Sequence, residues 1–189
     1  MSNPRDAILH RATFRLNSLF IPGLVLLAIV LWQDMPARYP VHFDLGGTPT
    51  RWEERGPAMW IILVAICLLS TAKLHILQFT VLSDPDSNLV NLPHKQLFQK
   101  LPVERRIPVL RRANRMVGLV NSAQLLVFAL ILVMTWATAH HPEHPAARLA
   151  NFTLFGTLVL VTVAPILEAL AMTRVIRRKL REEGLLPTS

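Results

Sequence analysis

Histidines and carboxylates gather in two short segments of this chain. One is "PVHFDLGG", with His42 and Asp44, and the other is "HHPEHP", which begins at His140. Imidazole and carboxylate groups bind zinc and copper, and residues two apart in an extended segment project from one face. We expect a zinc or copper site if the two segments meet. Its ligands would come from His42, Asp44, His140, His141 and His144.

A proline-stiffened linker without a ligand is the alternative for the second segment. Pro142 and Pro145 interrupt the run, and its ligands lack the fixed spacing of a helical metal motif. Histidines in exposed loops are compatible with a solvated linker of this composition. Both interpretations stay open at the level of sequence.

Charged and amide residues also interrupt long apolar runs. Lys73 lies 15 residues after Ala58, and Glu168 lies 17 residues after Asn151. At about 1.5 Å per helical residue, their depths are about 22 and about 25 Å. Because a central charge costs roughly 2.5 to 3.5 kcal/mol to insert, such groups pair inside a bundle. We therefore expect one polar cluster, formed by Lys73, Asn121, Gln124 and Glu168, with Asn114 on the same helical stripe as the two amides.

Two other interpretations of these residues remain. In one, Lys73 extends its ammonium to the inner headgroups and Glu168 lies near the interface. In the other, the cluster relays protons or ions, as intramembrane charges do in transporters. The first assigns the residues no function, and the second predicts a small transporter or channel.

Enzymatic chemistry has no support in the remaining residues. The chain contains no nucleophile and base motif, no glycine loop for phosphate and no helical zinc motif. Its one cysteine, Cys67, lies in an apolar run, so neither a disulfide nor a thiolate metal site is expected. The net charge of +8 fits a membrane surface rather than nucleic acid, because the basic residues flank apolar segments.

Apolar segments long enough to cross a bilayer organise the whole chain. Hydrophobic residues make up 52% of the sequence, more than in a soluble domain of this size. A helix needs about 20 residues to cross the hydrocarbon core. The sequence predicts an all-α integral membrane protein with a single domain of four transmembrane helices over residues 1–189. The segments are Leu16–Trp32, Ala58–Leu82, Met116–Ala139 and Leu149–Met172.

Lysine and arginine are distributed unevenly among the connections. They are frequent in the N-terminal arm, in residues 83–115 and in the tail at 174–189. The first loop instead balances three arginines against four acids, namely Arg38, Arg51 and Arg55 against Asp34, Asp44, Glu53 and Glu54. Basic residues near membrane segments stay on the cytoplasmic side. We therefore expect a multi-pass protein of the bacterial cytoplasmic (inner) membrane, with both termini in the cytoplasm and residues 39–56 outside.

The basic connection at 83–115 is too rich in leucine for disorder. Its composition predicts short helices in the headgroup plane, with Pro102 favouring a helix start and Pro108 interrupting it. Anionic lipid headgroups are the expected partner, and a docking surface for an acidic protein is the alternative. The arginines expected to face that partner are Arg105, Arg106, Arg111 and Arg112.

The outer loop has the pattern of a short extended segment. Tyr39, Val41 and Phe43 alternate with polar residues or proline, and turn-forming residues follow at 44–49. Aromatic residues here are expected near the outer headgroups. We expect this loop to bind a ligand through His42, Phe43, Asp44, Gly46, Gly47 and Trp52.

The loop sequence "PVHFDLGGTPTRW", placed just after a first span, resembles the domain of unknown function 1648. That family forms the N-terminal part of SdpI-like bacterial immunity proteins. The cytoplasmic "NLPHKQLFQKLPVERR" at 91–106 is similar to a second family motif, so the resemblance covers roughly residues 15–115.

The resemblance implies a binding, immunity or signalling module whose outer loop captures a toxin, a peptide or a membrane-protein partner. SdpI-like proteins with more membrane segments exist, so the architecture carries over more directly than the activity. The alternatives are a small transporter or channel, which would use the intramembrane polar cluster, and an accessory subunit of a larger membrane complex.

Overall fold

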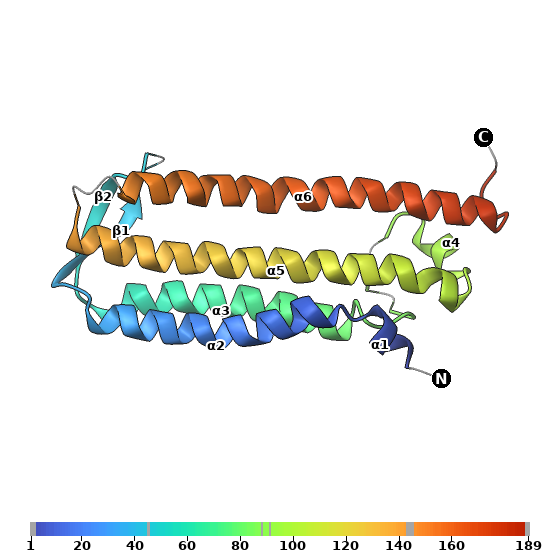
Figure 1. Ribbon diagram of the computed structural model, residues 1–189, viewed down its shortest axis with the longest axis horizontal. Helices are drawn as coiled ribbons and strands as arrows, with labels where there is room; N and C mark the ends of the chain where they lie inside the picture. The colour runs from blue at the N-terminus through green and yellow to red at the C-terminus, as the bar shows by residue number, and fades with distance from the viewer. Residues whose placement is uncertain (1–2, 45, 88, 91, 143–145, 188–189) are drawn as a thin grey trace. The chain divides into compact units, whose positions relative to one another are not determined.

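The computed structural model describes residues 3–44, 46–87, 89–90, 92–142 and 146–187 (Figure 1). Helices dominate this part of the chain, and one antiparallel pair of strands lies between the first two long helices. The elements are α1 (Pro4–Ile8), α2 (Arg11–Gln33), β1 (Arg38–Phe43), β2 (Pro49–Glu54), α3 (Pro57–Thr80), α4 (Lys95–Gln99), α5 (Val103–His140) and α6 (Ala146–Glu182).

Four helices in the described part of the chain are long and apolar enough to cross a membrane. They are Arg11–Gln33, Pro57–Thr80, Val103–His140 and the Gly156–Glu182 portion of α6. Their outward faces carry large apolar side chains such as Leu19, Leu69 and Leu167, each more than 60% exposed. Such faces are stable in lipid and not in water. The predicted fold class is confirmed, and the chain is a multi-pass membrane protein.

The chain divides into two compact units, and each long helix contributes to both. The first unit comprises Met1–Asn17, Lys73–Asn121 and Thr162–Ser189, and the second comprises Ser18–Ala72 and Ser122–Val161. The first unit has its own apolar core, to which α1, α4, α5 and α6 contribute buried side chains. Buried members of this core include Ile8, Leu82, Phe98, Leu110, Ile176 and Leu180.

The second unit packs α2, α3 and α5 together with the strands. Its buried core joins Leu24 and Ala28 of α2, Trp60 and Cys67 of α3, and Leu132 of α5. Met35, which lies between α2 and β1, and Tyr39 of β1 are part of the same core. The hairpin is therefore built into the packing of the helices from which it emerges.

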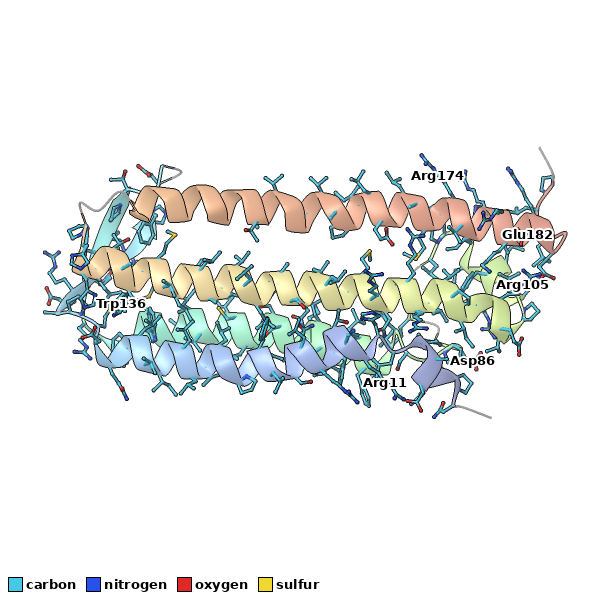
Figure 2. All side chains as sticks on the ribbon, in the orientation of Figure 1. Arg11, Asp86, Arg105, Trp136, Arg174 and Glu182 are labelled. Carbon is cyan, nitrogen blue, oxygen red and sulfur yellow. The ribbon has the colours of Figure 1, made fainter. Side chains whose placement is uncertain are left out.

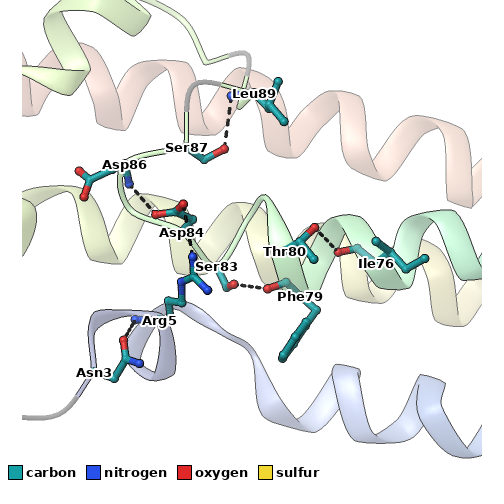
Figure 3. A network of polar contacts seen from close by, with 10 residues as sticks. All are labelled: Asn3, Arg5, Ile76, Phe79, Thr80, Ser83, Asp84, Asp86, Ser87 and Leu89. Carbon is teal, nitrogen blue, oxygen red and sulfur yellow. Dashed lines mark hydrogen bonds and ion pairs between the residues drawn. The ribbon is translucent and has the colours of Figure 1, made fainter.

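Side chains close the turn that follows α3 in the first unit (Figure 3). The carboxylate of Asp84 accepts the N–H of Asp86 at 3.1 Å and pairs with Arg5 at 3.6 Å. The Asn3 side chain in turn caps α1 by accepting the N–H of Arg5 at 3.1 Å. The segment before the first membrane helix is thus attached to the end of α3.

Helix α5 begins earlier than the apolar pattern predicts. The expected start beside Pro102 is confirmed, since the Pro102 carbonyl accepts the N–H groups of Arg105 and Arg106 at 3.0 and 3.2 Å. The expected interruption at Pro108 is wrong, because Pro108 lies inside the continuous helix. Near a helix start, proline forfeits a single backbone bond, here to the carbonyl of Glu104. Only α4 forms a separate short helix in the described part of the basic connection.

Candidate functional site

The hairpin between α2 and α3 pairs the predicted extended segment with a second strand. Tyr39 lies opposite Glu53, Pro40 opposite Trp52, and the register shifts after Pro40 and after His42. The extended segment is confirmed, but β2 has no clean alternation because charged residues fill both of its faces. The register shifts bend the hairpin and turn His42 toward solvent.

Asp44 and Gly47 close the turn of the hairpin. The Asp44 carboxylate accepts the N–H of Thr48 at 2.8 Å, and the Asp44 carbonyl accepts the N–H of Gly47 at 3.1 Å. Gly47 is buried with φ of 83°, a conformation that favours glycine. These two candidate residues therefore have a structural role in the turn.

An aromatic cluster holds the base of the hairpin. Tyr39 is 2% exposed, and its ring meets Trp32 and Trp60 edge-on at 6.0 and 6.5 Å between centres. Its hydroxyl donates to the carbonyl of Gly56 at 3.2 Å, and the Trp60 indole donates to the carbonyl of Ala28 at 3.2 Å. Burial, with a smaller contribution from Glu53, raises the pKa of Tyr39, so the phenol stays protonated. The base is thus packed, and the polar groups of Tyr39 and Trp60 are hydrogen-bonded.

Arg55 ties the end of β2 to the end of α2. Its guanidinium donates to the carbonyls of Trp32 at 2.8 Å and Gln33 at 3.1 Å, and it lies 5.3 Å from the centre of the Trp32 ring. The last carbonyls of a helix lack partners within the helix, so this arginine satisfies two of them. Cation–π attraction adds to that contact. The hairpin is therefore fixed at its base.

The exposed side chains of the hairpin lie toward its turn. His42, Asp44 and Gly46 are exposed, while Phe43 and Trp52 are half-buried. The imidazole Nδ1 of His42 is hydrogen-bonded to the hydroxyl of Thr50 across the strands. Sequence reasoning missed Thr50 and Arg51, which are both exposed on β2, because nothing in the pattern gave the strand register.

The described histidines do not form a metal cluster. His140 lies 3.4 Å from the Asp34 carboxylate, and its Nδ1 donates to the carbonyl of Trp136 at 2.9 Å. No three histidine, cysteine, aspartate or glutamate side chains are grouped for a metal in the part of the chain that the structure describes. Glu143 and His144 lie outside the described residues. The zinc or copper site therefore stays a prediction.

The intramembrane polar cluster differs from the predicted one. In the first unit, Glu168 pairs with Arg112 through two hydrogen bonds, one of them 2.9 Å from Nη2 to Oε2. Lys73 forms no ion pair among the described residues, so the expected contact between Lys73 and Glu168 is not formed. The guanidinium fork matches both carboxylate oxygens, which a single ammonium cannot do. The sequence predicts a third span that begins at Met116, and this start places Arg112 among the lipid headgroups and not beside Glu168.

The two amides of the predicted cluster are also placed separately. Gln124 donates to the hydroxyl of Ser70 at 2.6 Å in the second unit. Asn121 is fully buried in the first unit, and its amide atoms have no hydrogen-bond partner among the described residues. The predicted cluster is thus replaced by separate contacts.

A buried network that sequence reasoning missed joins three helices of the first unit. The fully buried amides of Gln78 and Asn114 face each other, with Gln78 Nε2 donating to Asn114 Oδ1 at 3.2 Å and Asn114 Nδ2 donating to the Gln78 carbonyl at 2.8 Å. Gln78 also donates to the hydroxyl of Thr13 at 3.0 Å, and the His10 N–H donates to Asn114 Oδ1 at 2.9 Å. Reciprocal amide contacts of this kind fix helix register in a membrane.

Gly118 lets the helices approach at this network. A Cβ at this position would lie 2.2 Å from Thr13 Oγ1 and 2.5 Å from Gln78 Nε2. The Gly118 carbonyl accepts the side-chain N–H of the fully buried Asn17 at 2.9 Å. Small residues at helix contacts allow such close backbone approach in membranes.

Three of the four arginines expected to face lipid are engaged within the protein. Arg106 is 7% exposed and donates to the carbonyl of Pro85 at 2.9 Å and to Asp86 at 3.2 Å. Arg105 pairs with Glu182 and Glu183 at 3.5 and 3.1 Å (Figure 2). Arg112 pairs with Glu168, as described above. Arg111 alone of the four is exposed without an ion pair among the described residues.

Comparison with known proteins assigns part of the chain. No curated protein and no solved structure matches it. A family model does match residues 19–67, which comprise most of α2, the hairpin and the first part of α3, all within the second unit. The match does not reach residues 91–106, so the second motif of the resemblance stays a prediction. Residues 19–67 of this membrane protein match the family model of a domain of unknown function (DUF1648), the family that the loop sequence resembles.

Proposed function

We propose that this chain is a binding module of the bacterial inner membrane, of the SdpI-like immunity kind, and that its hairpin captures a secreted toxin or peptide outside the cell. The observation that carries the proposal is the construction of the hairpin within the family-matched segment. Its base is buried between Trp32, Tyr39 and Trp60, whereas His42, Thr50 and Arg51 are exposed. A rigid scaffold that presents exposed polar side chains is typical of a recognition surface.

The charge distribution supports the outer position of the hairpin. The flanks of the other connections carry most lysines and arginines, whereas on the hairpin Arg38 and Arg51 pair with Glu54 and Glu53 at 3.7 and 3.2 Å. A segment with balanced charge is translocated more readily than a basic one. Both termini then lie in the cytoplasm.

A small transporter or channel is the second candidate. It would use the polar groups in the membrane-spanning helices, of which the Arg112 and Glu168 pair is the most charged. The carboxylate of Glu168 is held by Arg112 at both oxygens, and the amides of Gln78 and Asn114 hydrogen-bond to each other. The family match includes the hairpin and not these residues, which favours the binding module.

A challenge with the cell's own secretions tests the proposal. We expect a strain that lacks this protein to be inhibited by culture fluid of its parent, because an immunity module protects against a self-made toxin. The intact protein should restore growth. The triple variant His42→Ala, Thr50→Ala, Arg51→Ala should protect less well, so that its cells grow only when the culture fluid is diluted at least about tenfold further. A tenfold loss of affinity corresponds to about 1.4 kcal/mol of binding free energy.

The matched control removes another exposed pair from the same hairpin. Arg38→Ala with Glu54→Ala lies at the open end of the strands and should protect like the intact protein. Immunoblotting of membranes must show equal amounts of all forms. Growth of the deletion strain in parental culture fluid, or full protection by the triple variant, would contradict the proposal.

A further inference from the structure

Two arginines of α5 stand apart from the engaged basic residues of the first unit. Arg111 and Arg115 are four residues apart, so they project from one face of the helix. Both are exposed, and neither forms an ion pair or hydrogen bond among the described residues. Elsewhere in this unit Arg11 pairs with Asp6 at 3.1 Å, and Arg105, Arg106 and Arg112 have the partners given above. Arg111 and Arg115 thus form a local excess of positive charge.

His10, which directly precedes α2, is the third member of this group. Burial, followed by the charges of Arg115 and Arg111, lowers the pKa of its imidazole. The ring therefore lies within electrostatic range of both guanidinium groups. The positive charges of Arg111 and Arg115 disfavour a proton on His10, and the same positive potential stabilises a bound anion.

Hydrogen bonds fix His10 relative to α5. Its backbone N–H donates to Asn114 Oδ1 at 2.9 Å, one residue from Arg115. Its Nδ1 accepts the N–H of Thr13 at 3.4 Å, so in the neutral ring the proton lies on Nε2. Nε2 has no hydrogen bond among the described residues and keeps a donor for a ligand.

Among the described residues, no acidic side chain forms an ion pair with Arg111 or Arg115. The charge of Arg115 also acts on Glu168, but both carboxylate oxygens of Glu168 are held by Arg112. A guanidinium prefers an oxyanion that accepts several hydrogen bonds, such as a phosphate. The unmatched charge therefore favours an external phosphate group.

The position of the group along α5 identifies the source of that phosphate. Arg115 is followed directly by the apolar part of the helix, and one turn further Leu119 is 49% exposed. A phosphate at Arg111 and Arg115 thus has an apolar surface beside it that fits an acyl chain. A free phosphate ion would use only the charged part.

We propose that His10, Arg111 and Arg115 bind the phosphate of one anionic phospholipid, whose acyl chain lies along α5 at Leu119. The lipid extends the contact between the segment before α2 and the start of α5. Lipid recognition by this chain is then localised at a defined site instead of spread over the basic segments. The site is independent of the hairpin and of the ligand proposed for it.

Native mass spectrometry of the purified protein with phosphatidylglycerol tests the assignment. We expect one tightly retained lipid, and an affinity about 30-fold weaker in the variant Arg111→Gln, Arg115→Gln, since each basic residue at a membrane surface contributes about fivefold. The control Arg174→Gln, Arg177→Gln removes the same charge from α6. Both of its residues are exposed, and Arg174 points away from α5 (Figure 2). This control should retain the lipid.

Three outcomes would overturn the site. Equal weakening of lipid binding in both double variants would mean that the lipid is attracted to the whole basic surface and not to one site. Displacement of the lipid by inorganic phosphate in large excess means a phosphate site without a lipid requirement. A wild-type His10 ring resonance that does not move on titration with phosphatidylglycerol means that the headgroup binds elsewhere. The resonance uses the unchanged protein, so it decides the question even if the arginine variant folds poorly.

Discussion

Gly118→Ala will destabilise the protein strongly, although alanine is the better helix former. A methyl group at this position would lie 2.2 Å from Thr13 Oγ1 and 2.7 Å from Thr13 Cβ, distances that no packing tolerates. Because Thr13 and Gln78 are buried and hydrogen-bonded to the network, the helices must separate to admit the methyl group. Overpacking of this kind costs about 1 to 3 kcal/mol, and the loss of the buried amide contacts adds to it.

Thermal unfolding in detergent, followed by circular dichroism, measures this effect. The matched control is Gly23→Ala in α2, where an added Cβ has nothing within 4 Å. There the substitution should be neutral or stabilising by up to about 1 kcal/mol, the helix-propensity difference between the two residues. Equal melting temperatures for the two variants would mean that α2, α3 and α5 do not meet at Gly118.

Asn114→Leu is the second substitution with a large expected effect. The Asn114 side chain accepts from the His10 N–H and from Gln78 Nε2 and donates to the Gln78 carbonyl. Leucine would leave these buried partners unsatisfied, and each such group costs about 1 to 3 kcal/mol. Membrane contacts measured singly average about 0.6 kcal/mol, so we expect a total loss of about 2 to 4 kcal/mol.

Asn121 provides the matched control one heptad further along the same helix. It is as fully buried as Asn114, but its amide atoms have no hydrogen-bond partner among the described residues. Asn121→Leu removes an unsatisfied buried amide and should leave stability unchanged or raise it. The free energy of unfolding of both variants, measured by denaturation in mixed micelles, tests this difference. A loss of stability in the Asn121 variant equal to that in the Asn114 variant would contradict the network.

The spans could be predicted from sequence because bilayer thickness sets one requirement for every crossing helix. About 20 apolar residues are needed whatever the neighbouring helices are, so composition alone reveals them. The exact helix bounds depend on more than apolarity. Polar residues 103–115 continue α5, since a helix satisfies its own backbone outside the hydrocarbon as well as inside it. This is why the partner of Glu168 was missed.

The contacts between helices could not be predicted from single positions. Gln78 and Thr13 are isolated polar residues, 65 positions apart, whose contact depends on how α2 and α3 are rotated about their axes. Asn114 and Asn121 have the same residue type and lie on the same stripe, yet within the described part of the chain the side chain of Asn114 is hydrogen-bonded and that of Asn121 is not. Their difference arises from neighbours on other helices. Strand β1 of the hairpin could be predicted, because its apolar and polar residues alternate in the sequence. Strand β2 could not, because it lacks that alternation.

Opposite placement of the hairpin and of the basic segments is the central claim, because ligand capture outside and lipid binding inside both depend on it. The direct test is cysteine labelling in intact cells with a membrane-impermeant maleimide, in a Cys67→Ala background. Thr50→Cys and Arg177→Cys place single thiols at two exposed positions, on β2 and α6. The account predicts that Thr50→Cys reacts in intact cells and that Arg177→Cys reacts only after permeabilisation. Reaction of both positions from the same side would contradict it.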